Sequence, residues 1–247
     1  MIPKRAFFFW GGPGPMSWLR RQSIETFCRL NPEWDVDLFY RPGKNPVHRS
    51  DLFRYIELYS EGGYYFDTDI VFLRPFPEKY LDADVAITIT DELRFASIGV
   101  LGASRHSQFF LDAFNSATAR KNAPSYKPED YQHLGVGVLN RMFMDEMNLR
   151  HPDPGNCPDS FEIASKRYPE DKWVNLPYDL VMPVDSFSIP SLYTKSMSSP
   201  GIHRDVIGVH WFGGYPQSKE FERSPEDWPM CYMNHVLEMS ECLTPAR

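Results

Sequence analysis

Apolar and polar positions change their period within one stretch of the chain, from helical spacing to a strand-like run. Apolar residues recur at helical spacing over residues 52–59, so one face of a helix must pack against the rest of the protein. Ser50 is a favourable N-cap, and Gly62 and Gly63 are stop signals that supply positive φ. The pattern predicts a helix that begins after Ser50 and ends near Glu61.

The strand-like run that follows is interrupted by two carboxylates. Tyr64–Phe66 and Ile70–Leu73 are aromatic or β-branched on either side of Asp67, Thr68 and Asp69. Residues two apart in a strand point to one face, so the two carboxylates would meet there. Buried carboxylates need a cation or hydrogen bonds, and hard oxygen ligands suit Mg²⁺ or Mn²⁺. The alternative is a turn at the strand end whose carboxylates are simply solvated.

The same region carries a denser pattern, S-D-x-x-R-Y-x-x-L-x-x-x-G-G-x-Y-x-D-x-D, from Ser50 to Asp69. It resembles the signature of the DXD sugar transferases grouped as glycosyltransferase family 32, and the glucosylating domains of large bacterial toxins carry a similar block. The resemblance implies an α/β fold of the GT-A class, Rossmann-like, with a mixed central sheet flanked by helices. It also implies a nucleotide-sugar donor, a divalent metal and retention of anomeric configuration.

The resemblance assigns roles to five residues of this block. Asp67 and Asp69 are expected to hold the metal, with Asp67 also contacting the donor, and Tyr65 is an expected donor contact. Asp51 and Arg54 lie at i, i+3 on one face of the helix, where a surface salt bridge between them is the alternative interpretation. The resemblance implies instead that both contact the donor sugar and diphosphate. Asp51, Arg54, Asp67 and Asp69 are thus the expected catalytic residues.

The N-terminal stretch predicts a buried strand, Ala6–Trp10, that runs into the Gly-rich loop 11–15. This order is typical of nucleotide-binding α/β domains, although the loop lacks the spacing of a dinucleotide site. Ile2-Pro3-Lys4 and Trp10 are similar to the first strand of the resembled families, whose Trp lies beside the nucleotide base. Trp10 and Gly11 are therefore expected at the donor, and an ordinary core Trp is the alternative.

A late histidine completes the expected site. His210 closes the predicted strand 206–212 against Gly213 and Gly214. A lone histidine is more often structural, but the resemblance implies a metal or diphosphate ligand at this position. The family's following Ser-Trp is replaced here near Tyr215, which is a departure from the pattern.

The remaining hydrophobic pattern predicts an alternating α/β order, and the resemblance implies that it forms a single GT-A domain, 1–247. Residues 1–103 are expected to form the half that binds donor and metal, and residues 104–247 the acceptor half. The polar stretch 121–133 is interpreted as a mobile loop or lid. The predicted helices span 17–30 and 108–119, and the predicted strands span 34–40, 85–89, 98–103 and 173–176.

Charge and composition exclude several classes of protein. A net charge of −7 with scattered arginines argues against nucleic-acid binding. The four cysteines lie far apart in the sequence and form no C-x-x-C pair, so neither a zinc site nor a disulfide framework is indicated; they are Cys28, Cys157, Cys231 and Cys242. No run of about 18 apolar residues exists to span a membrane, and no signal peptide is evident. A cytoplasmic protein is the expectation.

These observations predict a metal-dependent, retaining glycosyltransferase with a Mn²⁺ or Mg²⁺ cofactor. The predicted donor is a UDP-sugar, with GDP-mannose as the second choice, and a hexosyl or N-acetylhexosaminyl unit would pass to a glycan, polysaccharide or other hydroxyl acceptor. No convincing nucleophile is apparent, which favours front-face attack. The alternatives are a haloacid-dehalogenase-type phosphatase that uses the D-x-D, and a non-catalytic sugar-binding module.

Overall fold

The computed structural model describes residues 1–90, 95–142, 160–184, 188–194, 202–224 and 231–240. The chain divides into two compact units that interleave along the sequence. Unit 1 consists of Met1–Gly14, Asp35–Phe66 and Pro77–Pro177, and unit 2 of Pro15–Trp34, Asp67–Phe76 and Tyr178–Arg247. The two sequence halves expected to serve donor and acceptor remain a prediction.

Unit 1 contains a six-stranded sheet in the order β2-β1-β3-β6-β5-β7. β1 pairs in parallel with β2 and β3, and β5 with β7, whereas β6 is antiparallel to both β3 and β5. The expected mixed central sheet is therefore confirmed. The strands are β1 (Arg5–Trp10), β2 (Asp35–Tyr40), β3 (Gly63–Phe66), β5 (Val85–Thr90), β6 (Phe95–Ala103) and β7 (Trp173–Asn175).

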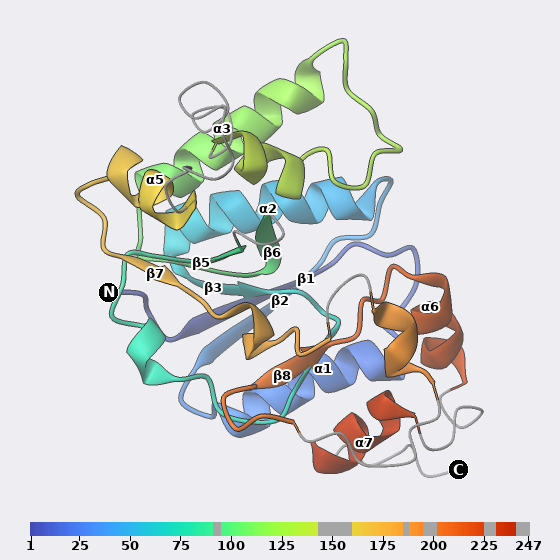
Figure 1. The fold of residues 1–247 in the computed structure, drawn as a ribbon. Coiled ribbons are helices and arrows are strands. Elements are labelled where there is room, and N and C mark those ends of the chain that lie inside the picture. The colour runs from blue at the N-terminus through green and yellow to red at the C-terminus, as the bar shows by residue number, and fades with distance from the viewer. Residues whose placement is uncertain (91–94, 143–159, 185–187, 195–201, 225–230, 241–247) are drawn as a thin grey trace. The chain divides into compact units, whose positions relative to one another are not determined.

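Helices pack against this sheet, as expected. α2 (Pro46–Glu61) and α3 (Gln108–Asn122) lie on the same side of it (Figure 1). Their apolar faces form one core with the strands, because apolar area removed from water is the main stabilising term. That core includes Phe53, Tyr55 and Leu58 of α2, Phe109 and Phe110 of α3, and Phe7, Tyr65 and Leu101 of the sheet. Unit 1 also contains α5 (Ser160–Arg167) and a 3₁₀ turn, Glu78–Tyr80.

The helix of the D-x-D block begins earlier than predicted. Its N-cap is Asn45, and Pro46 occupies the first turn, where a missing N–H has no cost. The prediction of a Ser50 N-cap is therefore wrong, and Asp51 lies beyond the first turn. The predicted end at Glu61 is confirmed, and Gly62 adopts a φ of 65° that a residue with a Cβ rarely adopts.

Unit 2 is built around a two-stranded antiparallel ribbon, β4 (Ile70–Phe72) and β8 (Gly208–His210), in which Ile70 lies opposite His210. α1 (Trp18–Leu30) is capped by Ser17, whose hydroxyl accepts from the Arg20 N–H at 3.2 Å. Helices α6 (Pro216–Arg223) and α7 (Tyr232–Met239) and the 3₁₀ turns Tyr178–Leu180 and Ile189–Leu192 complete the unit. Its core includes Leu19, Val71, Val209, Trp211, Phe221 and Val236.

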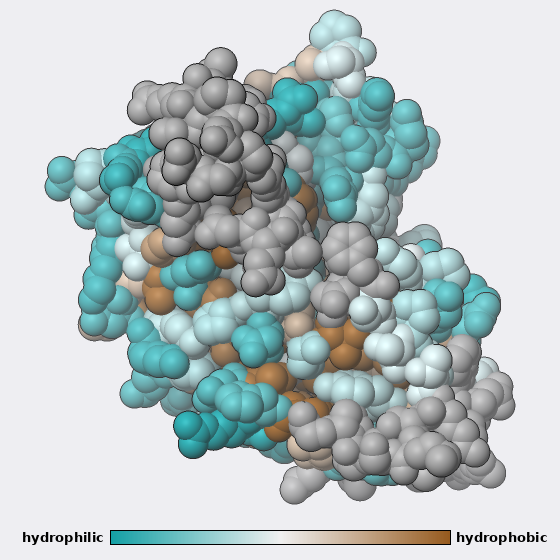
Figure 2. All heavy atoms as spheres, in the orientation of Figure 1, coloured by the Kyte–Doolittle hydropathy of each residue, from teal (hydrophilic) through white to brown (hydrophobic). Residues whose placement is uncertain are grey.

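The described surface is mainly hydrophilic on the face drawn in Figure 2, where apolar residues show in small patches among polar ones. Large exposed apolar residues such as Leu38 and Met239 are scattered, as they are on most proteins. In the described ranges, none of the helices combines the length and the apolar composition needed to cross a membrane. Cys28 and Cys231 are free thiols, and Cys157 and Cys242 lie outside the described residues.

A candidate metal centre and a buried ion pair

The D-x-D segment forms a turn rather than part of a strand. β3 ends at Phe66, Thr68 and Asp69 lie in a turn, and β4 begins at Ile70 in a different sheet. The prediction that both carboxylates point from one face of a strand is therefore wrong. Apolar residues on both sides suggested one continuous strand, but they belong to two short strands with different partners. The turn between them is what brings the carboxylates together.

The turn places both carboxylates beside the imidazole of His210. Because β4 and β8 pair with Ile70 opposite His210, the imidazole lies next to Asp69. Its Nε2 is 3.1 Å from Asp69 Oδ1 and 3.8 Å from Asp67 Oδ2. One ligand atom from each of the three lies within 4.8 Å of the others, an arrangement that could hold a metal ion. The side chains of Asp67 and Asp69 are 25% and 14% exposed, so the cluster is open to a ligand.

His210 and Asp69 shift each other's pKa in opposite directions. Burial disfavours protonation of His210, but the Asp69 and Asp67 carboxylates outweigh it and raise the His210 pKa to about 9. Burial would also raise the pKa of Asp69, yet the His210 and Arg20 cations and the Gly213 N–H hold that pKa well below its usual value. Without an ion, His210 and Asp69 therefore form an imidazolium–carboxylate pair at neutral pH.

The loop after β8 holds Asp69 from the other side. The Gly213 N–H donates to Asp69 Oδ2 at 2.8 Å, which leaves Oδ1 facing the imidazole. The Trp211 N–H donates to the Asp69 carbonyl at 2.9 Å. The carbonyl of Trp211 in turn accepts from the hydroxyls of Tyr193 and Ser218, at 2.7 and 2.9 Å. Trp211 and Gly213, on either side of Phe212, are thus both hydrogen-bonded to Asp69.

Phe212 carries backbone strain in this loop. Its φ of 52° lies in the left-handed region, which is unusual for a bulky residue and is found most often where structure or function requires it. Its ring packs edge-on against the His210 ring, with centroids 4.4 Å apart. The strained residue therefore precedes the N–H that binds Asp69 and also confines the imidazole. The sequence predicted neither feature, because only the glycines marked this loop.

The donor atoms of the cluster fit a divalent cation. Two carboxylates supply hard oxygen ligands, which suit Mg²⁺ and Mn²⁺, and the imidazole nitrogen favours a transition metal such as Mn²⁺ over Mg²⁺. Three protein ligands leave coordination positions for other oxygen donors such as phosphates and water.

Asp51 and Arg54 form an ion pair inside unit 1. Arg54 Nη2 lies 3.2 Å from Asp51 Oδ1, and the two side chains are 3% and 0% exposed. The two side chains thus pair with each other, as in the alternative interpretation, but the pair is buried rather than on the surface. A Cβ at Gly135 would lie 2.8 Å from Asp51 Oδ1, so only glycine fits against this carboxylate. Apart from the glycine itself, no local pattern indicated that contact.

Arg54 is also held by neutral groups of unit 1. Its Nε donates to the Ser50 carbonyl at 3.3 Å, its Nη1 to the Ile98 carbonyl at 2.5 Å and its Nη2 to the Ser50 hydroxyl at 2.7 Å. The guanidinium carbon lies 4.3 Å from the centroid of the Tyr65 ring, a cation–π distance. Tyr65, an expected donor contact, is itself buried beneath Arg54.

Trp10 is partly buried at the end of β1, with its side chain fixed in place. Its indole N–H donates to the Gly14 carbonyl at 2.9 Å, and a Cβ at Gly12 would collide with the indole ring. A Cβ at Gly11 would lie 2.8 Å from the Phe9 ring. The glycines therefore serve close packing here, and the Trp10 ring keeps part of its surface exposed.

The match to one protein-family model agrees with the chemistry of the D-x-D block. No curated protein sequence matches the chain. Among solved structures, the chain is similar to one titled PaToxG Glycosyltransferase, with a TM-score of 0.47 and 15% identity over 68% of this chain and 74% of that one. Residues 19–89, which contain the ion pair and the D-x-D turn, match the family described as glycosyltransferase sugar-binding region containing DXD motif, a match that supports glycosyl transfer as the class of reaction.

Proposed function

We propose that the protein is a metal-dependent, retaining glycosyltransferase that uses a nucleotide-sugar donor, with a UDP-sugar favoured and GDP-mannose as the second choice. A hexosyl or N-acetylhexosaminyl unit passes to a hydroxyl of a glycan, polysaccharide or other acceptor. The observation that carries the proposal is the cluster of Asp67, Asp69 and His210, whose ligand atoms lie within 4.8 Å of one another. Its D-x-D turn lies inside the region that matches a sugar-binding family.

In this proposal three side chains of unit 2 hold the ion, which is Mn²⁺ or Mg²⁺. Asp69 contributes Oδ1, because its Oδ2 is engaged by the Gly213 N–H. Asp67 contributes Oδ2, and His210 contributes Nε2 after losing its proton. When bound, the ion would act as a Lewis acid that stabilises the negative charge on the departing nucleoside diphosphate. Asp67 and Asp69 are catalytic residues in this sense.

In the proposed reaction, one bond breaks and one forms at the anomeric carbon. The bond from that carbon to the diphosphate oxygen breaks, and its electron pair leaves with the diphosphate. The acceptor oxygen bonds to the same carbon from the same face, which retains the configuration. The proton of the acceptor hydroxyl passes to the departing phosphate oxygen, so no protein nucleophile is required.

In unit 1 we propose that Arg54 and Asp51 serve the donor sugar and diphosphate. Arg54 would exchange one of its internal acceptors, such as the Ile98 carbonyl, for a phosphate oxygen. A charge-assisted bond of that kind is shorter and roughly twice as strong as a bond between neutral groups. Asp51 would accept from sugar hydroxyls, and Tyr65 would keep the guanidinium in place through its ring.

We propose that Trp10 and Gly11 contribute at the nucleotide base. The fixed, partly exposed indole offers a flat surface on which a base can stack. Its fixed orientation lowers the entropy that is lost on binding.

The test is release of nucleoside diphosphate from a panel of UDP- and GDP-sugars, with and without Mn²⁺. We expect one donor to be hydrolysed or transferred only with metal, and EDTA to abolish the reaction until Mn²⁺ is restored. NMR of the product's anomeric proton reads retention directly. Release of phosphate from a generic phosphomonoester would favour the phosphatase alternative. Binding of sugar with no release from any donor would favour the non-catalytic module.

A further inference from the structure

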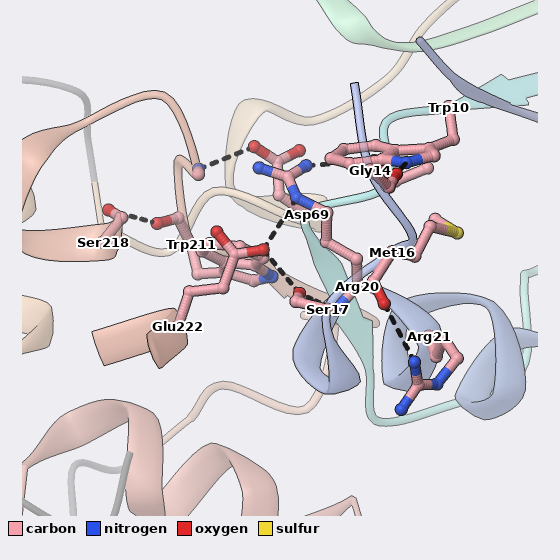
Figure 3. A network of polar contacts seen from close by, with 12 residues as sticks. Trp10, Gly14, Met16, Ser17, Arg20, Arg21, Asp69, Trp211, Ser218 and Glu222 are labelled. Atoms are coloured by element: carbon pink, nitrogen blue, oxygen red, sulfur yellow. Dashed lines mark hydrogen bonds and ion pairs between the residues drawn. The ribbon is translucent and has the colours of Figure 1, made fainter. Parts of the chain in front are cut away.

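Arg20 on α1 contacts both the D-x-D turn and the loop after β8, the two segments that shape the candidate metal centre. Figure 3 shows Arg20 together with Asp69 of the turn and Trp211 of the loop. Arg20 Nη1 donates to the hydroxyl of Thr68, the middle residue of the D-x-D turn, at 3.1 Å. A Cβ at Gly213 would collide with Arg20 Nη2, so the loop that binds Asp69 lies directly against the guanidinium. One side chain therefore contacts the turn and the loop together.

The guanidinium is itself fixed within unit 2. Its Nε donates to Glu222 Oε1 of α6 at 3.0 Å, and the two side chains are only 13% and 15% exposed. The Ser17 hydroxyl donates to the same carboxylate oxygen, which orients it (Figure 3). The guanidinium carbon also lies 5.0 Å from the centroid of a Trp211 ring. An arginine held on three sides in this way can impose its geometry on what it binds.

We propose that Arg20 is a positioning residue, which holds the D-x-D turn through the Thr68 hydroxyl and supports the Gly213 loop so that Asp67 and Asp69 are pre-arranged for a divalent cation. The inference rests on the proposed function, because it concerns the same metal. It adds a residue from α1, which the D-x-D pattern does not include. Groups that orient the ligands of a metal typically change its affinity by about 10- to 100-fold.

The sign of the effect distinguishes positioning from charge. Arg20 is a cation near a cation site, so by Coulomb's law alone its removal should strengthen metal binding. If Arg20 arranges the ligands, its removal should weaken metal binding despite that relief. Thr68→Val tests the same contact without any change in charge, since only the hydroxyl is lost.

The experiment is calorimetric titration of the metal-free protein with Mn²⁺ alone. We expect Arg20→Ala to weaken Mn²⁺ binding by about 10- to 100-fold, and Thr68→Val to weaken it by a smaller factor. The double variant should bind Mn²⁺ no more weakly than Arg20→Ala, because Arg20→Ala already breaks the contact with Thr68 that Thr68→Val removes. Arg21→Ala is the matched control, since the neighbouring Arg21 lies exposed and its Nη1 donates to the Met16 carbonyl rather than to a residue of the candidate metal centre. It should bind Mn²⁺ like the wild type.

Unchanged or tighter Mn²⁺ binding in Arg20→Ala would overturn the proposal, as would unchanged binding in Thr68→Val. If Arg20→Ala fails to fold, Thr68→Val alone decides, with circular dichroism as the check on its fold. Failure of the wild type to bind Mn²⁺ would overturn the proposed function instead. With the preferred donor, the Mn²⁺ concentration for half-maximal rate should rise in Thr68→Val while the rate at saturating Mn²⁺ stays within about threefold, the pattern expected for lost affinity.

Discussion

The cluster of Asp67, Asp69 and His210 and the buried Asp51–Arg54 pair both set a carboxylate beside a cation, yet they are built differently. At the cluster, Asp69 faces a histidine whose proton can leave, and its side chain remains 14% exposed. At the pair, Asp51 faces Arg54, which keeps its charge at every accessible pH, and neither side chain is more than 3% exposed. The cluster can exchange one cation for another. The pair cannot.

This contrast indicates how charge is used in each unit. Two carboxylates gathered at a turn need a positive partner, and without a metal ion the proton on His210 supplies it. A buried arginine and aspartate instead depend on each other, because either one alone would be an uncompensated buried charge. Substitutions at the cluster should therefore affect ligand binding first, and substitutions at the pair should affect the fold first.

The largest expected effect is that of Asp69→Asn on turnover. The amide is a weaker, neutral ligand, so we expect the transfer rate to fall at least about a thousandfold, or about 4 kcal/mol. Asp67 and Asp69 lie two residues apart in the sequence, which by itself suggests that removing one carboxylate relieves its repulsion with the other. The structure reverses that expectation, because Asp69 faces two cations, and we expect the metal-free variant to be less stable as well. Steady-state kinetics with thermal unfolding measures both, and near-normal turnover would exclude Asp69 as a ligand.

At the buried Asp51–Arg54 pair, a substitution should lower stability before it affects ligand binding. Arg54→Ala leaves Asp51 buried without its cation and should lower the free energy of unfolding by about 3 kcal/mol. Urea unfolding measures this loss. Arg49→Ala, on the same helix but partly exposed, is the control and should cost little. Activity is then compared only where the variant is folded, and a stable Arg54→Ala with full activity would refute both the structural and the donor role.

The cluster alone should show proton–metal competition. The His210 pKa of about 9 lies above its ordinary value of 6.5, so Mn²⁺ must displace a proton, and its affinity should rise by about tenfold per pH unit from pH 7 towards 9. Calorimetry at pH 7 in buffers of different protonation heat should show about one proton released per ion. His210→Gln should lose most of this slope, and a wild-type affinity that is flat with pH would contradict the assignment.

The same shifted groups fix how the metal-free protein's stability depends on pH. The His210 contribution is fully present below pH 6.5 and is lost as the pH rises through about 9. The pKa of Asp69 is lowered, so its contribution is present above the ordinary value of 3.8 and is lost as the pH falls further. Saturation with Mn²⁺ should remove the loss at high pH.

Trp10 belongs to neither charged region and should show the smallest effect. If its indole stacks on a base, Trp10→Ala should weaken nucleoside diphosphate binding by roughly 1–3 kcal/mol. Trp10→Phe should keep most of the affinity, because a flat ring remains for stacking even though the hydrogen bond to the Gly14 carbonyl is lost. Equal affinity in all three proteins would return Trp10 to a purely structural role.

Local patterns predicted much of the fold. Helical spacing and glycine stop signals placed the end of α2 at Glu61, and most predicted strands formed near their expected positions. The start of α2 was missed because Ser50 is a favourable N-cap residue, whereas the helix begins at Pro46, which fits the first turn. The burial of the Asp51–Arg54 pair was missed because spacing along a helix does not say what covers it.

The candidate site was only partly predictable, for a related reason. Asp67, Asp69 and His210 were identified by residue type and resemblance, and the structure brings all three together. The groups that hold them in place come from elsewhere in the chain and carry no local pattern. Asp69 and Gly213, for example, are 144 residues apart. Nothing in the sequence around Arg20 indicates that it contacts the candidate site. Such contacts depend on tertiary pairing, which a local pattern cannot encode.

The pairing of β4 with β8 also bears on when the cluster forms during synthesis. Ile70 leaves the ribosome long before its partner His210, and domains assemble as their parts emerge, at about 5–20 residues per second. The carboxylates of the D-x-D turn are therefore synthesised many seconds before His210 is available to them. Closing so long a loop is slow, because its entropy is lost before the contacts that reward it are made. Competence to bind the ion should therefore appear only after β8 has been synthesised and has paired with β4.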